Sequence, residues 1–333
     1  LSAAHLLNKN GSPIIGFANN SASVSEDSRA SISIKDKLHA WWHGIEVPSR
    51  KGSPEASGVT TTAKIVATDN PDAQGINSAE ADLQDPVSPW SEERVALAKE
   101  LWSAGFMVPG GTDYVAKLVA GCTLSPAETL LEVGVGMGGC SKAIIEKYGN
   151  YIIGYEADEN LGDSARLFST VHKFQDRLEV INERYEAILP KSGYFRAALL
   201  RDVLYTVEDK EALLRRVIGS LKRGVSYLIM TDFLFDQDDM SPELKAWVES
   251  EECPVYPWTE AALTKCLKLV GLTPRVILDD SEDYQSLVNQ AWGDYLKRLQ
   301  EERTSDGMRV VVAREAERWT LLVAALQNGS LHH

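Results

Sequence analysis

The sequence predicts an α/β protein with a mostly parallel, twisted sheet that carries helices on both faces. From about residue 90 onward, apolar runs of strand length alternate with segments of helical periodicity, which is typical of a parallel sheet covered by helices. Glycines cluster between positions 134 and 139, directly after the first apolar run, and an acid, Glu156, ends the second run. A glycine turn at the end of such a strand allows the backbone to approach a ligand.

The residues before this pattern, 1–88, predict an extended or disordered arm. The stretch from Ser49 to Pro89 contains no aromatic residue, so it lacks the apolar surface that offsets the entropy cost of ordering a chain. One short amphipathic helix is predicted near 34–45. This helix either docks on its own domain or inserts into another subunit. Its apolar residues at helical spacing are Ile34, Leu38, Trp41, Trp42 and Ile45.

The remaining residues, 89–333, predict one domain. Ser91 and Thr259 are predicted N-caps of two of its helices, and Gly105 and Gly271 are predicted to end them. The predicted strands are 129–136, 151–157, 178–183, 197–202, 226–233 and 274–280. The predicted helices are 91–105, 111–122, 139–149, 209–224, 259–271, 283–303 and 309–327.

The composition argues against several classes of function. The formal net charge is -14, with 34 Lys and Arg against 48 Asp and Glu, so we expect no nucleic-acid partner. No apolar run approaches the roughly 18 residues that cross a bilayer, so no transmembrane segment is expected. The four cysteines show no CxxC spacing and predict free thiols, and the six histidines do not cluster with acids or thiols, so no metal site is predicted.

The two ends of the sequence are compatible with more than one cellular compartment. The sequence opens at Leu1, and its first residues do not form a signal peptide. We expect a cytoplasmic protein, or a protein of the mitochondrial matrix if Leu1 follows a removed transit peptide. The pair His332-His333 is either native or the remnant of a tag.

The glycine turn carries the strongest chemical signal. Its spacing is Glu132-x-Gly134-x-Gly136-x-Gly138, followed by a helix, a second strand and the acid Glu156. A carboxylate at this position can accept two hydrogen bonds from a ribose diol. A generic glycine turn and a nicotinamide site are the alternatives, but the spacing differs from the dinucleotide pattern, and an acid precedes the first glycine.

This series resembles motif I of class I S-adenosylmethionine-dependent methyltransferases, which implies a Rossmann-like fold with helical cap or C-terminal helices. The segments "GFMVPGG", "LLRDVLYTVEDKEALL" and "YLIMTDF" are similar in order to those of the phosphoethanolamine N-methyltransferases. The resemblance implies S-adenosyl-L-methionine as the methyl donor. In that family a final strand follows the last helix, and the sequence given stops at "GSLHH" before such a strand.

The resemblance also implies roles for individual residues. Asp202 would face the pocket of the methyl donor, and the segment from Asn182 to Tyr185 would border the adenine. The residues that would hold the donor are Glu132, Gly134, Gly136, Gly138, Glu156, Asn182 and Arg201.

The chain departs from the family at the catalytic positions. The family pairs a tyrosine, in the loop before its Gly-Gly pair, with a histidine three residues after the Arg-Asp aspartate. The matching positions here are Phe106 and Tyr205, so the dyad cannot form in the same way, and a tyrosine is a poor base at neutral pH. Phe233 stands where the family often has another tyrosine. The predicted catalytic residues are therefore Asp202 and Tyr205.

The segment that would hold the acceptor also departs. The family has tyrosines and an arginine there, whereas this chain has acids at 249–252, which repel a phosphate dianion. Phosphoethanolamine is therefore not the expected substrate. The acids form either a solvated face or a trap for a cation. Aromatic residues that either cage the acceptor or pack in the core are Phe106, Tyr114, Trp247, Tyr256 and Trp258.

Three functions remain open at this point. The first is an active methyltransferase for a small-molecule or lipid-like acceptor, with nitrogen or oxygen as the nucleophile. The second is a methyltransferase-fold protein with reduced or lost activity that serves as a subunit of a larger complex, with the N-terminal arm contacting a protein partner. The third is a methylase of protein or RNA, which the acidic charge disfavours.

Overall fold

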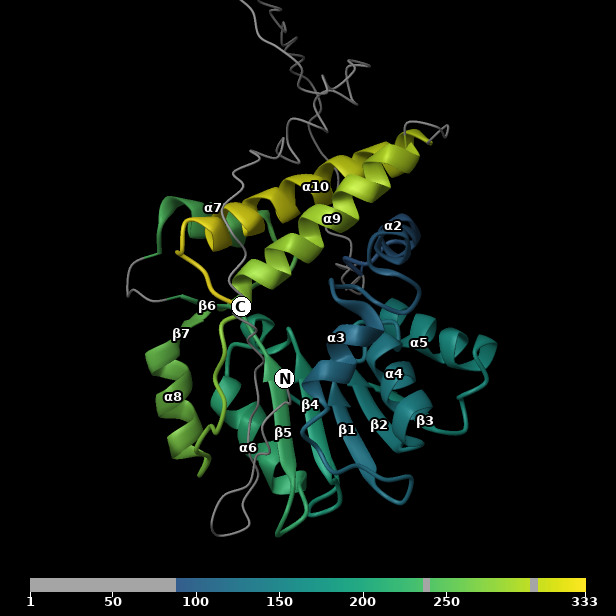
Figure 1. The fold of residues 1–333 in the computed structure, drawn as a ribbon, viewed down its shortest axis with the longest axis vertical. Coiled ribbons are helices and arrows are strands. Elements are labelled where there is room, and N and C mark those ends of the chain that lie inside the picture. Colours follow the sequence, from purple (N-terminus) through teal and green to yellow (C-terminus); the bar gives the residue numbers. More distant parts are fainter. Residues whose placement is uncertain (1–87, 236–239, 300–304) are drawn as a thin grey trace, which may run out of the picture.

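The computed structural model describes residues 88–235, 240–299 and 305–333. The predicted N-terminal arm, with its amphipathic helix near 34–45, lies outside the described residues apart from its last position. Figure 1 shows the described part as a central sheet flanked by helices, with two long helices crossing one end of it.

The sheet is parallel throughout, as the sequence predicts. Its strand order is β3-β2-β1-β4-β5, and each neighbouring pair runs parallel. The chain moves from β1 outward to β3 and then returns to the other side of β1 with β4. Ligands bind at such a switch point, outside the carboxyl ends of the strands. The strands are β1 (Thr129–Val133), β2 (Tyr151–Glu156), β3 (Leu178–Asn182), β4 (Ala197–Arg201) and β5 (Tyr227–Thr231).

Helices of ordinary length connect and cover these strands. Ser91 and Thr259 cap their helices, each side chain accepting the backbone N–H of the residue three positions later, which confirms the predicted starts. None of the helices in the described residues has the length and apolar character that a membrane span requires. The helices are α2 (Glu92–Trp102), α3 (Gly111–Leu118), α4 (Gly139–Tyr148), α5 (Glu159–Val171), α6 (Lys210–Ser220), α7 (Pro242–Ser250), α8 (Glu260–Leu269), α9 (Ser281–Leu299) and α10 (Asp306–Gln327).

The two faces of the sheet carry separate cores. Side chains alternate along each strand, so Leu130 and Ile229 belong to one core whereas Leu131 and Met230 belong to the other. The first core packs against α2 to α4, α9 and α10, and the second packs against α6 and α8. All four of these strand residues are at most 1% exposed, which is expected for a parallel sheet covered on both faces.

Several regions differ from the prediction. The predicted strand at 274–280 does not form; that segment has no regular secondary structure, and its last residue, Asp280, donates its N–H to the carbonyl of His333 at 3.0 Å. The helices α5 and α7 form in segments for which no element was predicted. Short two-residue strands, β6 (Leu234–Phe235) and β7 (Trp258–Thr259), make a second small sheet.

Candidate functional site

A cavity of about 920 Å³ opens at the carboxyl ends of β1, β2 and β4. Figure 1 shows α7, α9 and α10 lying across this end of the sheet. Among the residues predicted for the site, those that line the cavity are Phe106, Gly134, Gly136, Glu156, Arg201, Asp202, Tyr205, Trp247 and Tyr256. Those that do not line it are Tyr114, Glu132, Gly138, Asn182 and Trp258.

The glycine turn requires glycine at two of its positions. Gly134 and Gly136 have positive φ angles of 80° and 56°, which residues with a side chain rarely adopt. A Cβ at Gly134 would collide with Cγ2 of Val203, and a Cβ at Gly136 would lie 2.7 Å from Sδ of Met107. The turn therefore lets its backbone pass close to the cavity.

Glu156 stands at the end of β2 and faces the turn. One of its carboxylate oxygens accepts the N–H of Gly136 at 2.7 Å, and the other accepts the N–H of Asp158 at 3.0 Å. Burial raises its pKa to about 6, against the effect of these backbone hydrogen bonds. The carboxylate is therefore ionised above neutral pH and is fixed in orientation, as a ribose diol would require.

Glu132 lies inside the protein and not in the cavity lining. Its carboxyl group is 3% exposed and accepts the hydroxyl of Ser141, which is also buried. Burial raises the pKa of Glu132 to about 8. Glu132 joins β1 to α4 from behind the lining, and its contact with the donor stays a prediction.

The raised pKa of Glu132 predicts how the free energy of unfolding depends on pH. Because the folded-state pKa is raised, Glu132 favours folding at low pH, and the advantage is lost as the pH rises toward about 8. We expect the unfolding free energy of wild type, relative to Glu132→Gln, to fall between about pH 5 and about pH 8. Urea unfolding at three pH values measures it. A difference that stays constant with pH would show that Glu132 is ionised in the folded protein.

Arg201 and Asp202 follow each other at the end of β4. The guanidinium of Arg201 lies over the rings of Phe106 and Tyr114, with its carbon 5.9 Å and 4.8 Å from their centroids, and it donates to the carbonyl of Pro109. Its Nε is buried and has no hydrogen-bond partner among the described residues. An orphaned charged donor beside a cavity fits an anionic group of a ligand.

Asp202 has a strained backbone, with a φ of 53°. Strain of this kind costs about 1–3 kcal/mol and is common at functional sites. Its carboxylate accepts the hydroxyl of Thr231, contacts Nε2 of His333 at 2.9 Å, and lies 3.5 Å from the hydroxyl of Tyr284. Burial would raise the pKa of Asp202, but the charge and hydrogen bond of His333, the charge of Arg201 and the hydrogen bond from Thr231 together outweigh it, and the pKa is lowered.

Four aromatic side chains form a chamber beside Asp202. Phe233 lies at the centre, with ring centroids 5.1 Å from Tyr205, 5.4 Å from Trp247 and 5.7 Å from Tyr284. All four residues line the cavity. We call them the aromatic chamber.

The other predicted acceptor residues take different positions. The hydroxyl of Tyr114 donates to Asp280 at 2.7 Å, and Nε1 of Trp258 donates to Asp232 at 2.7 Å. Tyr256 lines the cavity but is 37% exposed. Asp232 also accepts the N–H of Tyr205 at 2.8 Å. Tyr114 and Trp258 therefore support the residues that line the cavity and do not line it themselves.

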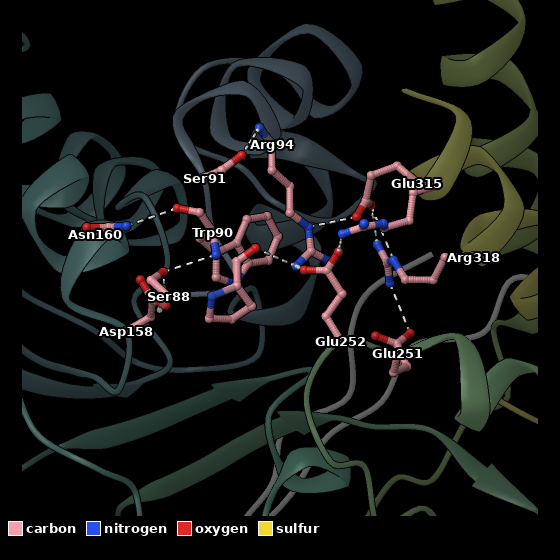
Figure 2. Close-up of polar contacts among 12 residues, drawn as sticks. Ser88, Trp90, Ser91, Arg94, Asp158, Asn160, Glu251, Glu252, Glu315 and Arg318 are labelled. Atoms are coloured by element: carbon pink, nitrogen blue, oxygen red, sulfur yellow. Dashed lines mark hydrogen bonds and ion pairs between the residues drawn. The ribbon is translucent and has the colours of Figure 1, made fainter. Parts of the chain in front are cut away.

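A network of ion pairs closes one side of the cavity, and Figure 2 shows it. Arg318 of α10 contacts Glu251 at 3.0 Å and Glu315 at 2.8 Å, and Arg94 of α2 contacts Glu315 at 2.7 Å and Glu252 at 3.0 Å. We call these five residues the roof network. Its two arginines and Glu251 and Glu315 are each at most 10% exposed at the side chain.

The acids at 249–252 have two different outcomes. Glu249 is exposed, as the solvated face predicts, whereas the roof network corrects the interpretation of the other two acids. Glu251 and Glu252 are neither a solvated face nor a trap for an external cation, because both are paired with arginines of the same chain. Arg314 adds a further contact to Glu252 at 2.8 Å. These pairs could not be predicted from local patterns, because the arginine partners of Glu251 and Glu252 are 62 to 158 positions away in the chain.

Gly138 and Asn182 hold the walls behind the lining. The amide of Asn182 donates to the backbone carbonyl of Asp158 at 3.2 Å, and a Cβ at Gly162 would lie 2.8 Å from its Cγ. Gly138 has a φ of 88° and caps α4. The sequence did not indicate three residues that contact the site or line it. These residues are Tyr284, Arg318 and His333.

Residues 111–275 match the model of the protein family described as Methyltransferase domain. Phosphoethanolamine N-methyltransferase 1 from Zea mays is 23% identical over 239 residues, which cover 68% of this chain and 47% of the maize protein. The chain spans less than half the length of the plant relatives that it matches.

Solved structures show the same fold. Phosphoethanolamine N-methyltransferase 2 from Haemonchus contortus, in complex with phosphomonomethylethanolamine and S-adenosylhomocysteine, has a TM-score of 0.62 at 17% identity, and the match covers 72% of this chain and 55% of that one. Geranyl diphosphate C-methyltransferase from Streptomyces coelicolor has a TM-score of 0.51 at 14% identity. That match covers 73% of this chain and 96% of the Streptomyces chain. The described part of the chain therefore has the Rossmann-like fold of these methyltransferases, its residues 111–275 match the methyltransferase domain model, and its sequence resembles the phosphoethanolamine N-methyltransferases.

Proposed function

We propose that the chain binds S-adenosylmethionine in this cavity and transfers its methyl group to nitrogen or oxygen of a small-molecule or lipid-like acceptor. One observation carries the proposal: the glycine turn, Glu156, Asp202 and the aromatic chamber all line the same cavity. The residues on the donor side thus open directly onto the residues that would hold an acceptor.

The donor side fits S-adenosylmethionine group by group. Glu156 presents a carboxylate whose orientation two backbone N–H groups fix, which suits the ribose hydroxyls. The buried Nε of Arg201, without a partner among the described residues, suits the carboxylate of the methionine part. The turn at Gly134 and Gly136 brings backbone between these two groups.

The acceptor side explains how this chain could work without the dyad of the family. S-adenosylmethionine supplies an electrophilic methyl group on a sulfonium. The aromatic chamber would exclude water and hold a cationic or apolar acceptor in line with that methyl group. An amine acceptor must first lose its proton, and Asp202 is the group placed to take it. Burial raises the pKa of Tyr205 well above 10, so its hydroxyl positions the acceptor and does not act as a base.

The roof network argues for an acceptor without phosphate. Each of its arginines already contacts two carboxylates. Binding a phosphate dianion there would require breaking a buried ion pair, which is costly. We therefore propose that phosphoethanolamine is not the acceptor, for a reason different from the charge repulsion expected from the sequence.

Calorimetry with S-adenosylmethionine tests the donor half of the proposal. We expect binding with a dissociation constant on the order of micromolar, which corresponds to about -8 kcal/mol. ATP serves as the control, because it shares the adenosine part and lacks the methionine part. Absence of binding would reject the enzyme and leave a methyltransferase fold that serves a structural role. If the donor binds, transfer of a labelled methyl group to pools of amines and alcohols, with phosphoethanolamine as a separate sample, identifies the acceptor class.

A further inference from the structure

His333 lies between two carboxylates at the back of the cavity. Its Nε2 is 2.9 Å from Oδ1 of Asp202, and its Nδ1 is 2.6 Å from Oδ1 of Asp280. The imidazole side chain is 1% exposed. Ionised carboxylates only accept hydrogen bonds, so an imidazole between two of them must donate from both nitrogens, which only the cationic form does.

Backbone contacts hold this imidazole in place. The N–H of His333 donates to Oγ of Ser281 at 2.9 Å, and its carbonyl accepts the N–H of Asp280 at 3.0 Å. The preceding residue, His332, exchanges two backbone hydrogen bonds with Leu234, at 2.7 and 2.8 Å. The ring also stacks against Tyr284, with centroids 4.0 Å apart. These contacts fix the position of the His333 imidazole.

The charges around Asp202 balance only when His333 is a cation. Arg201 and His333 oppose Asp202 and Asp280, so the group is neutral as a whole. Burial opposes the cation, but Asp202 and Asp280 outweigh it and raise the pKa of His333 to about 10. Burial also raises the pKa values of the other titratable groups that face this cluster, so they stay neutral at physiological pH: Tyr114, Cys140, Tyr205 and Tyr284.

We propose that His333 is a positioning residue that keeps Asp202 ionised and turned toward the cavity, so that this otherwise neutral group presents an ionised carboxylate to the sulfonium of the methyl donor. Asp202 lines the cavity whereas His333 lies behind it, so His333 acts through Asp202. The inference rests on the proposed binding of S-adenosylmethionine. The inference adds His333 to the site: its cationic form, acting through Asp202, increases the affinity for the charged donor relative to the neutral product S-adenosylhomocysteine.

The experiment compares affinities for S-adenosylmethionine and S-adenosylhomocysteine, which differ by the methyl group and its positive charge. Calorimetry is run from about pH 6 to about pH 8 on wild type, His333→Gln and Asp202→Asn. Wild type should bind S-adenosylmethionine more tightly than S-adenosylhomocysteine, and the ratio of the two affinities should change little with pH. In His333→Gln, Asp202 loses its cation and its pKa rises, so the ratio should fall about tenfold at the acidic end and recover as the pH rises.

The control is His332→Gln, whose ring contacts Asp279 at 2.9 Å; it should behave as wild type. Asp202→Asn should lower the ratio at every pH. A wild-type ratio that persists in His333→Gln, without pH dependence, would overturn the inference while leaving donor binding intact. Failure of wild type to bind either ligand would instead reject the proposed function.

A second measurement applies if His333→Gln does not fold. Nitrogen-15 NMR of the wild-type imidazole at about pH 8 reports the protonation of each ring nitrogen. The inference requires His333 to be protonated at both nitrogens, above the pH at which an ordinary histidine is neutral. A neutral tautomer at that pH would contradict it.

Discussion

Replacing Glu315 by alanine should reduce the free energy of unfolding by about 3 kcal/mol. Glu315 is 5% exposed and contacts Arg94 at 2.7 Å and Arg318 at 2.8 Å. Removing it leaves two buried guanidinium groups with one carboxylate partner each. Chemical denaturation at neutral pH measures the loss, and the effect should be larger than that of any exposed ion pair in the described residues.

The matched control is Glu317→Ala, two positions along the same helix and exposed. It should change stability by less than about 0.5 kcal/mol. The pH dependence adds a check. Burial would raise the pKa of Glu315, but Arg318 and Arg94 outweigh it and lower the pKa, so its stabilisation is present above about pH 4 and is lost as the pH falls. Equal losses in the two variants would show that the roof network does not stabilise the fold.

Replacing Glu156 by alanine should weaken S-adenosylmethionine binding by about 100-fold or more. Two charge-assisted hydrogen bonds to a ribose diol contribute about 1.5–3 kcal/mol each, and a tenfold change in affinity corresponds to about 1.4 kcal/mol. The variant also removes the acceptors of the Gly136 and Asp158 N–H groups, which loosens the glycine turn. Calorimetry with the same ligand measures the change.

Two further variants separate the ligand contact from the support of the turn. Glu156→Gln keeps one oxygen to accept from the backbone but loses the charge, so it should retain the turn and still bind more weakly than wild type. Glu159→Ala, exposed in the first turn of α5, should bind as wild type. Full affinity in Glu156→Gln would show that the carboxylate charge does not recognise the donor.

The sheet and the glycine turn could be predicted because their signals are local. Five apolar runs appear as parallel strands, and the residues from Gly134 to Glu156 form the turn and the acid that their spacing indicates. Such features depend on backbone conformation and on burial within short segments. The predicted N-caps at Ser91 and Thr259 belong to the same class.

The acceptor side could not be predicted because its contacts join distant parts of the chain. The pair of Asp202 and His333 spans 131 positions, and nothing in the sequence distinguished His333 from a terminal tag remnant. The apolar pattern at 274–280 predicted a strand, yet Asp280 there serves His333 and Tyr114 through its side chain. Of the aromatic residues predicted for the acceptor, Phe106, Trp247 and Tyr256 line the cavity, and only tertiary packing decides which of them do.

The residues of the roof network lie far apart in the sequence, and this separation affects the order in which the chain can fold during synthesis. Arg94 and Glu315 are separated by 221 positions, so Arg94 leaves the ribosome long before its buried partner. Until α10 is synthesised, Arg94 can pair only with Glu252, and Glu251 still lacks its partner Arg318, so the network stays incomplete. The sheet with its glycine turn can form first, and the closed site is completed only when the last helix arrives.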